Sequence, residues 1–268
     1  SSAITGIAID KGILKSTDEK VFELLPQQYR NAQNSDKRKA LMNIADLLTM
    51  SSGLDAIDFG IDTNSIASED NYQSSKDWIK TIVEAPMVNE PGTHANYGSA
   101  NPYLLGVALN EIIKDPLELF IDNNLFSPLG ISNYIIPTDC FDHPYFAGGM
   151  MMTSRDMLKF GQLYLDKGNW KGNVIVSSDW VDRSFKKYRV LENTTKKNEY
   201  GYLWWHQNYK VGADTIQSIE ARGAGGQYIF VIPKYNLVAV ITSGNFRNGR
   251  VWQPEKVMEN YILPALIQ

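Results

Sequence analysis

Hydroxyl groups and a glycine-rich backbone are the parts of this sequence whose types and spacing could do chemistry. Tyr97 lies in Tyr97-Gly98-Ser99, and Gly223-Ala224-Gly225-Gly226 forms a run of small residues. Acyl transfer needs an activated hydroxyl, a proton carrier within its reach, and fixed N–H donors where negative charge develops. Taken alone, Tyr97 is one of 14 tyrosines and would be expected in the core, and the glycine run would be expected to form a hairpin turn. Either segment alone is therefore a weak indication of catalysis.

Thiol and imidazole chemistry has little support in the sequence. Cys140 is the single cysteine, which excludes an intramolecular disulfide, and it is expected to be inert. His94, His143 and His206 are not spaced as metal ligands, so each is expected to be a surface or hydrogen-bonded residue. The sequence therefore predicts no metal site and no cofactor.

Composition and charge define the class of protein. The chain has 268 residues, of which 43% are hydrophobic and 21% are charged, as in ordinary globular domains. Its net charge of −4 gives no electrostatic reason to expect nucleic acid or an anionic membrane as a partner. No apolar stretch approaches the roughly 18 residues that a transmembrane helix needs, so no transmembrane segment is expected. Because no linker or repeat divides the chain, residues 1–268 are expected to form a single domain.

The elements that must position the candidate residues change in character along the chain. Residues 40–190 are predicted to be mainly helical, and residues 200–268 are predicted to form a sheet followed by a C-terminal helix. Helices are expected at residues 1–12, 43–50, 74–85, 103–113, 116–126, 154–167, 178–187 and 254–267. Strands are expected at residues 200–207, 215–221, 227–233 and 237–243, and polar loops at residues 27–39 and 55–73. The pattern predicts an α+β fold, in which a helical region packs against an antiparallel sheet.

Five stretches together carry a resemblance to a known family. They are Ile44-Ala45-Asp46-Leu47-Leu48-Thr49-Met50-Ser51-Ser52-Gly53-Leu54, Pro91-Gly92-Thr93-His94-Ala95-Asn96-Tyr97-Gly98-Ser99, Ala147-Gly148-Gly149-Met150-Met151-Met152-Thr153-Ser154-Arg155-Asp156, Tyr200-Gly201-Tyr202-Leu203-Trp204-Trp205 and Ala221-Arg222-Gly223-Ala224-Gly225-Gly226-Gln227. In order and spacing they resemble the β-lactamase-related serine hydrolases. That family includes class C β-lactamases, D-Ala-D-Ala carboxypeptidases, family VIII esterases and 6-aminohexanoate-dimer hydrolases. The resemblance covers nearly the whole chain and implies a β-lactamase/transpeptidase-like fold, in which helices flank an antiparallel sheet and a helical region stands beside it.

The resemblance implies roles for the second motif of the family, a tyrosine two residues before an asparagine. Tyr97 matches the tyrosine, which carries a proton between nucleophile and leaving group, and a nearby lysine ammonium is expected to favour its phenolate form. Ser99 stands where the family usually has asparagine. It is either a catalytic residue or the N-terminal residue of the next helix.

The third motif of the family, Lys-Thr-Gly, is replaced by Ala221-Arg222-Gly223. The cation that binds a substrate carboxylate is therefore missing, and Arg222 is expected to point to the opposite face of the strand from Ala221. What the resemblance still implies for this motif concerns its main chain. Gly223 and Gly225 are expected to allow a close approach of the substrate, and the N–H of Ala224 is the candidate oxyanion donor. Arg222→Ala is expected to change kcat/KM modestly, whereas Gly223→Val is expected to obstruct the cleft and abolish activity. Trp204 or Trp205 is expected to line the acyl pocket, and Trp205 is the candidate.

The first motif of the family, Ser-x-x-Lys, is absent where it is expected. Ser184-Phe185-Lys186-Lys187 fits the pattern, but it follows the second motif and ends a late helix. The resemblance makes residues 1–12 the continuation of the Ser-x-x-Lys helix, so the nucleophile and its lysine are expected shortly before Ser1. Two strands of the family fold are then also absent, which would leave residues 237–242 as an unpaired apolar edge.

Three hypotheses about function stay open at this point. The first is a serine hydrolase that acts on a small-molecule ester or amide, such as a short-chain ester or an ω-amino-acid oligomer, rather than an efficient β-lactamase. The second is an N-terminal-nucleophile hydrolase, in which the α-amine of Ser1 activates its own hydroxyl. The third is a non-catalytic binding or sensor relative that retains the cleft. The resemblance slightly favours a bacterial periplasmic or secreted location, and the oligomeric state is not indicated.

Overall fold

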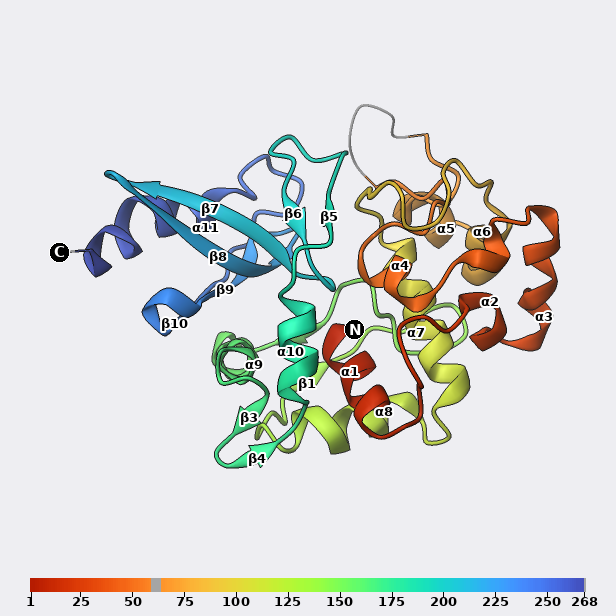
Figure 1. Ribbon diagram of the computed structural model, residues 1–268, viewed down its shortest axis with the longest axis horizontal. Coiled ribbons are helices and arrows are strands. Elements are labelled where there is room, and N and C mark those ends of the chain that lie inside the picture. The colour runs from red at the N-terminus through yellow and green to blue at the C-terminus, as the bar shows by residue number, and fades with distance from the viewer. Residues whose placement is uncertain (59–63, 268) are drawn as a thin grey trace.

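In the computed structural model, which describes residues 1–58 and 64–267, an antiparallel sheet lies beside a mainly helical region (Figure 1). The sheet has six strands in the order β10-β9-β8-β7-β6-β5. The strands are β5 (Arg189–Val190), β6 (Glu199–Tyr200), β7 (Trp205–Val211), β8 (Asp214–Gly223), β9 (Gln227–Ile232) and β10 (Leu237–Ile241). The expected α+β architecture is confirmed.

Successive side chains of a strand point to opposite faces of the sheet, and here both faces carry apolar residues. Helices cover both faces. One face carries Tyr209, Ile216, Tyr228 and Phe230, which pack against the C-terminal helical segment at Met258. That segment consists of α11 (Gln253–Val257), η5 (Met258–Ile262) and η6 (Pro264–Leu266). The opposite face carries Ile229 and Val238, against which α9 (Ser154–Leu165) packs so closely that a Cβ on Gly161 would lie within 2.7 Å of both side chains.

The remaining helices are short (Figure 1). They are α1 (Ser2–Asp10), α2 (Val21–Leu24), α3 (Gln27–Arg30), η1 (Asn31–Ser35), η2 (Lys39–Leu41), α4 (Ile44–Leu48), α5 (Glu69–Gln73), α6 (Trp78–Glu84), α7 (Ala100–Ile112), α8 (Leu117–Ile121), η3 (Asp122–Phe126) and α10 (Ser178–Ser184). Of these, α2, α4 and α6 contact α7, the longest of them. Two small ladders join β1 (Tyr134–Ile135) to β2 (Met151–Met152) and β3 (Asn169–Trp170) to β4 (Asn173–Val174). The side chains of Asn43 and Asp46 form a reciprocal capping box at the start of α4.

The polar segment at residues 27–39 is not the surface loop that its composition predicts. It contains α3 and η1, and Lys39 at its end is 1% exposed. The Lys39 ammonium donates hydrogen bonds to the Val83 carbonyl at 2.7 Å and to the Ser35 hydroxyl at 3.1 Å. The lysine thereby satisfies a carbonyl in the last turn of α6, a tertiary contact that local polarity does not reveal.

Two further boundaries differ from those expected. The strand predicted at residues 200–207 is interrupted, because β6 ends at Tyr200 and β7 begins at Trp205. Leu203 adopts a positive φ of 63° in the turn between them, and its N–H donates to the Leu48 carbonyl at 2.9 Å. The loop predicted at residues 55–73 includes α5 at its end, and its residues 59–63 lie outside the described part of the chain.

Strand β10 lies at one edge of the sheet, as expected for residues 237–242. Within the described residues it pairs with β9 alone, from Leu237 opposite Ile232 to Ile241 opposite Tyr228. Its side chains are all half-buried, partly through the contact with α9.

His206 on β7 differs from the surface or hydrogen-bonded residue that the sequence predicts. It is 5% exposed, and within the described part of the chain neither ring nitrogen has a hydrogen-bond partner. Burial, followed by the positive charge of Lys187, lowers the pKa of His206 from 6.5 to about 4. The imidazole is therefore neutral in the folded protein at neutral pH. His94 and His143, in contrast, lie within ion-pair distance of Glu192 and Asp139 and are more exposed.

This buried imidazole is expected to make the fold sensitive to acid. Because the pKa is lower in the folded state than in the unfolded state, the unfolded chain takes up the proton first, and stability falls as the pH drops from 6.5 towards 4. The shift corresponds to about 3 kcal/mol across that range. Urea unfolding at a series of pH values should show this loss in the parent protein and a smaller one in His206→Gln. The exposed-site control His94→Gln should keep the parental slope, and equal slopes in all three proteins would contradict the assignment.

Candidate active site

Tyr97 lies on the loop between α6 and α7, and the backbone of this loop is held from two sides. The amide side chain of Asn193 accepts a hydrogen bond from the Tyr97 N–H at 2.7 Å and donates one to the Tyr97 carbonyl at 3.0 Å. On the other side, the N–H of Asn96 donates to the carbonyl of Met50 at 3.0 Å. Met50 itself adopts a left-handed φ of 58°, at the turn that ends α4. The contacts fix the position at which the tyrosine leaves the main chain.

Gly98 is required by close packing of two backbone segments. A Cβ at this position would lie 1.8 Å from the carbonyl oxygen of Ala56. The next residue, Ser99, is 5% exposed, and both its N–H and its hydroxyl donate to a carboxylate oxygen of Asp58 at 2.6 Å. Ser99 is the N-cap residue of α7. These bonds give Ser99 a structural role at the start of the helix, one of the two alternatives that the sequence left open.

Gly98→Ala is expected to destabilise the protein by about 1–3 kcal/mol, because the added methyl group forces the Ala56 backbone aside. The matched control is Gly148→Ala, since a Cβ on Gly148 meets nothing within 4 Å. Chemical denaturation of the two variants measures the difference. Equal stabilities would show that the segment at Ala56 yields without cost.

Aromatic rings surround the Tyr97 side chain. The Trp205 ring lies 5.2 Å from it at an interplanar angle of 33°, and Tyr200 presents its edge at 6.5 Å. Burial raises the pKa of Tyr97, and the carboxylates of Asp58 and Glu69 raise it further. Tyr97 therefore carries its proton at neutral pH in this environment. The lysine ammonium that the resemblance places near this phenol is expected before Ser1, so its effect on the pKa stays a prediction.

The two adjacent tryptophans have separate surroundings. Trp204 is 2% exposed and packs among Phe160, Tyr164 and Phe185 in the core. Trp205 packs against Tyr97. Of the pair, Trp205 is thus the one beside the predicted proton carrier.

Arg222, at the third motif, belongs to a buried cluster of charges. Its Nε donates to a carboxylate oxygen of Glu220 at 2.8 Å, and its Nη atoms approach Glu220 at 2.7 Å and Glu255 at 3.3 Å. The three side chains are at most 6% exposed. Ala221 instead packs with the core on the other side of the sheet, so the expected opposition of Ala221 and Arg222 is confirmed.

The glycine-rich turn between β8 and β9 is filled by its own chain. The side chain of Gln227 accepts a hydrogen bond from the Gly225 N–H at 3.2 Å and donates to the Ser243 carbonyl at 2.6 Å. A Cβ on either Gly223 or Gly225 would lie 2.6 Å from the end of this side chain. The end of the Gln227 side chain therefore lies against both glycines. The N–H of Ala224 donates to no acceptor within the described residues, and Ala224 is exposed, as an oxyanion donor requires.

Ser184, the serine of the late Ser-x-x-Lys sequence, lacks the surroundings of a nucleophile. It is fully buried, donates to the Trp180 carbonyl at 2.8 Å and lies 3.3 Å from the Ser2 hydroxyl. Lys187, the lysine of the same sequence, forms an ion pair with Glu199. The late sequence therefore serves the packing of α10.

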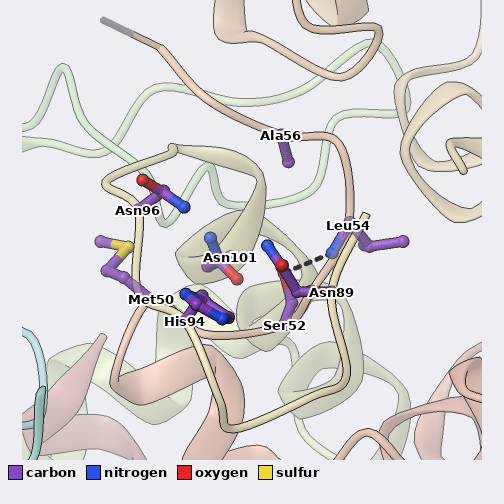
Figure 2. Close-up of a pocket in the computed structure, with 9 residues that line it drawn as sticks. Met50, Ser52, Leu54, Ala56, Asn89, His94, Asn96 and Asn101 are labelled. Atoms are coloured by element: carbon purple, nitrogen blue, oxygen red, sulfur yellow. Dashed lines mark hydrogen bonds between the residues drawn. The ribbon is translucent and has the colours of Figure 1, made fainter. Parts of the chain in front are cut away.

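A small pocket lies beside the Tyr97 loop (Figure 2). Segments around Ser52, Asn89, Asn96 and Asn101 enclose it, and the Ser52 hydroxyl accepts a bond from the Leu54 N–H at 3.4 Å. It has room for about one water molecule, which is too little for a substrate. The residues that line the pocket include Asn96 of the Tyr97 loop and Met50, to which its N–H donates.

Some of the supporting residues have no signal in the sequence. Asn193 is 96 positions from Tyr97, and Glu255 is 33 positions beyond Arg222. Within the described residues, no group of three or more His, Cys, Asp or Glu side chains could hold a metal ion. In the same part of the chain, no helix is long and apolar enough to cross a membrane.

Comparisons with known proteins show the family and the fold. A family model described as Beta-lactamase matches residues 3–255. A structure from Bacillus anthracis named "Putative 6-aminohexanoate-dimer hydrolase" is 19% identical, with a TM-score of 0.74, over 100% of this chain and 72% of that chain. The beta-lactamase/D-alanine carboxypeptidase of Yersinia pestis, in complex with citrate, is 18% identical, with a TM-score of 0.69, over 100% of this chain and 81% of that chain.

A curated relative matches over a shorter region. The "Putative D-alanyl-D-alanine carboxypeptidase" of Escherichia coli (strain K12) is 23% identical over 118 residues, which are 44% of this chain and 27% of that protein. At these identities the similarity to solved structures establishes the fold.

Proposed function

The chain belongs to the Beta-lactamase family, and from this premise we propose that it carries the proton-transfer and oxyanion parts of a serine hydrolase acting on a small ester or amide. The observation that supports this most directly is the packing of Tyr97, from the second motif, on Trp205, which in turn contacts Arg222 of the third motif. Segments more than 100 residues apart in sequence thus meet around one tyrosine, as acyl-transfer chemistry requires.

In the proposed reaction, the lysine of a Ser-x-x-Lys sequence accepts the proton of the serine hydroxyl as the serine attacks the substrate carbonyl, and it returns this proton to the serine when the acyl-enzyme is hydrolysed. The backbone N–H of Ala224 stabilises the oxyanion. Tyr97, which is protonated because burial raises its pKa, donates its proton to the leaving alkoxide or amine. The tyrosine regains a proton when water attacks the acyl-enzyme. A cation close to the phenol would be needed for Tyr97 to act as the base in the first step.

The nucleophile is proposed to come from a Ser-x-x-Lys sequence outside these 268 residues. The single such sequence among them contains Ser184, which is buried and hydrogen-bonded to the main chain. The N-terminal-nucleophile hypothesis is not favoured, because the Ser1 hydroxyl donates to the Phe146 carbonyl at 2.7 Å.

The substrate class follows from the third motif. Ala221 stands where relatives have the cation that binds a substrate carboxylate, so substrates that need such a cation are expected to be poor. We therefore favour a short-chain ester or an ω-amino-acid amide over a β-lactam or a D-Ala-D-Ala peptide. Trp205 is 8% exposed and is covered by Tyr97 and by the Arg222 guanidinium, so we assign it the support of Tyr97 before a contact with the acyl group.

A substrate panel tests the proposal. The full-length protein should be assayed with p-nitrophenyl butyrate, the 6-aminohexanoate dimer, nitrocefin and a D-Ala-D-Ala peptide. The expected result is a higher kcat/KM for the ester or the ω-amino-acid dimer than for the other two. Preference for nitrocefin or the peptide would contradict the proposed substrate class, and hydrolysis of none would favour the non-catalytic relative.

A further inference from the structure

We propose that Arg222 is a positioning residue, whose guanidinium holds the Trp205 ring and thereby sets the orientation of the Tyr97 ring. The inference rests on the proposed function, in which Tyr97 carries the proton. It assigns this arginine a role on the face of the sheet away from Ala221.

The first observation is a continuous stack of flat groups. The central carbon of the Arg222 guanidinium lies 4.8 Å from the Trp205 ring centroid and 5.4 Å from that of Tyr228. Trp205 in turn packs on Tyr97 at 5.2 Å. Tyr200 presents its edge to both rings, at 5.4 Å from Trp205 and 6.5 Å from Tyr97. A rotation of the guanidinium would therefore change the surface on which Trp205 rests.

The second observation is that the guanidinium plane is fixed by carboxylates from two elements. Glu220 on β8 holds one side of Arg222, and Glu255 on α11 holds another. These carboxylates are themselves held, because Tyr209 donates to Glu220 at 2.9 Å and Tyr228 lies at 3.3 Å from Glu255. An arginine suits this place because its planar cation stacks on rings and meets two carboxylates at once, whereas the ammonium of lysine is a point charge.

The third observation concerns what remains adjustable at Tyr97. The side chain of Asn193 bonds to the N–H and the carbonyl of Tyr97, and the rotation of the tyrosine ring about its side-chain bonds is a separate degree of freedom. That rotation is set by the groups packed against the ring, of which Trp205 is one. Through Glu255, the C-terminal helical segment is thereby linked to the orientation of the proton carrier.

The test uses Arg222→Lys in the full-length protein, because lysine keeps the positive charge between the carboxylates and removes the planar group. With p-nitrophenyl butyrate, kcat is expected to fall about 10-fold while KM changes less than 2-fold, since a small misplacement of a catalytic group slows the chemical step. If this variant does not fold, Glu255→Gln, which keeps the guanidinium and loosens its clamp, should show a smaller change of the same kind.

A spectroscopic measurement reports on the ring directly. With 3-fluorotyrosine incorporated at position 97 of the full-length protein, Arg222→Lys is expected to shift or broaden the fluorine resonance. The matched control is Tyr209→Phe, which removes a hydrogen bond from the same charge cluster without touching the stack. It should leave both the resonance and kcat near their parental values.

Each outcome decides the proposal. A shifted resonance with reduced kcat, in Arg222→Lys but not in Tyr209→Phe, supports it. An unchanged resonance, an unchanged kcat, or equal effects in both variants would overturn it. Because the fluorine signal does not depend on turnover, a parent protein that hydrolyses no substrate would contradict the proposed function alone, and the resonance would still show whether Arg222 orients Tyr97.

Discussion

Tyr97→Phe is expected to lower kcat for ester hydrolysis by about 10²–10⁴, the usual contribution of a general acid–base group. The substitution keeps the ring that packs on Trp205 and removes the hydroxyl alone. KM should change little, because the hydroxyl acts on the leaving group during the reaction. Steady-state kinetics of the full-length protein with an ester and an amide measures both constants.

Tyr200→Phe provides the matched control for this prediction. It removes a buried hydroxyl from a ring that touches both Tyr97 and Trp205. It should retain most of the parental kcat. Comparable losses in the two variants would mean that the aromatic cluster, and not the Tyr97 hydroxyl, accounts for the effect. Near-normal turnover by Tyr97→Phe would remove this tyrosine from the mechanism.

Arg222→Ala is expected to lower the free energy of unfolding by about 3–5 kcal/mol at pH 7.5, because Glu220 would remain buried without its cation, whereas Glu255 keeps its ion pair with Lys196. The expectation drawn from the sequence, a modest change in kcat/KM for this variant, concerns activity and not stability. Burial already raises the pKa of Glu220, and the charge of Arg222 counteracts that rise. Without the arginine, the carboxyl pKa should rise further.

The pH dependence of that loss gives a second check. A carboxyl group whose pKa is raised in the folded state costs stability above its unfolded pKa, and the cost disappears as the pH falls. The difference in stability between parent and Arg222→Ala should therefore shrink towards pH 5. Urea unfolding at pH 7.5 and pH 5 measures it, with the exposed Arg250→Ala as the control. A change below about 0.5 kcal/mol at pH 7.5, the size usual for surface substitutions, would contradict the buried network.

Local patterns predicted the elements that position the site. The alternation of side chains along residues 215–221 correctly separated Arg222 from Ala221 across the sheet. The helix expected at residues 43–50 is present as α4, with Asn43 as its cap and Asp46 in its first turn. Both features depend on neighbours two or three residues apart, which is the range over which sequence patterns are informative.

Contacts between distant segments could not be predicted in the same way. The break between Tyr200 and Trp205 depends on the bond from Leu203 to Leu48, and the burial of Lys39 depends on the Val83 carbonyl. The contact of the Gln227 side chain with the glycines of the third motif was likewise not indicated by the sequence. In each case tertiary packing supplies a partner that the local composition does not specify.

Covalent capture of the nucleophile tests the central claim, acyl-enzyme chemistry assisted by Tyr97, most directly. The full-length protein should be treated with a fluorophosphonate, and the adduct located by intact-mass measurement and peptide mapping. We expect a single adduct on the serine of a Ser-x-x-Lys sequence outside residues 1–268, formed more slowly in Tyr97→Phe. No adduct, or an adduct on Ser184, Ser1 or another serine within these residues, would contradict the account.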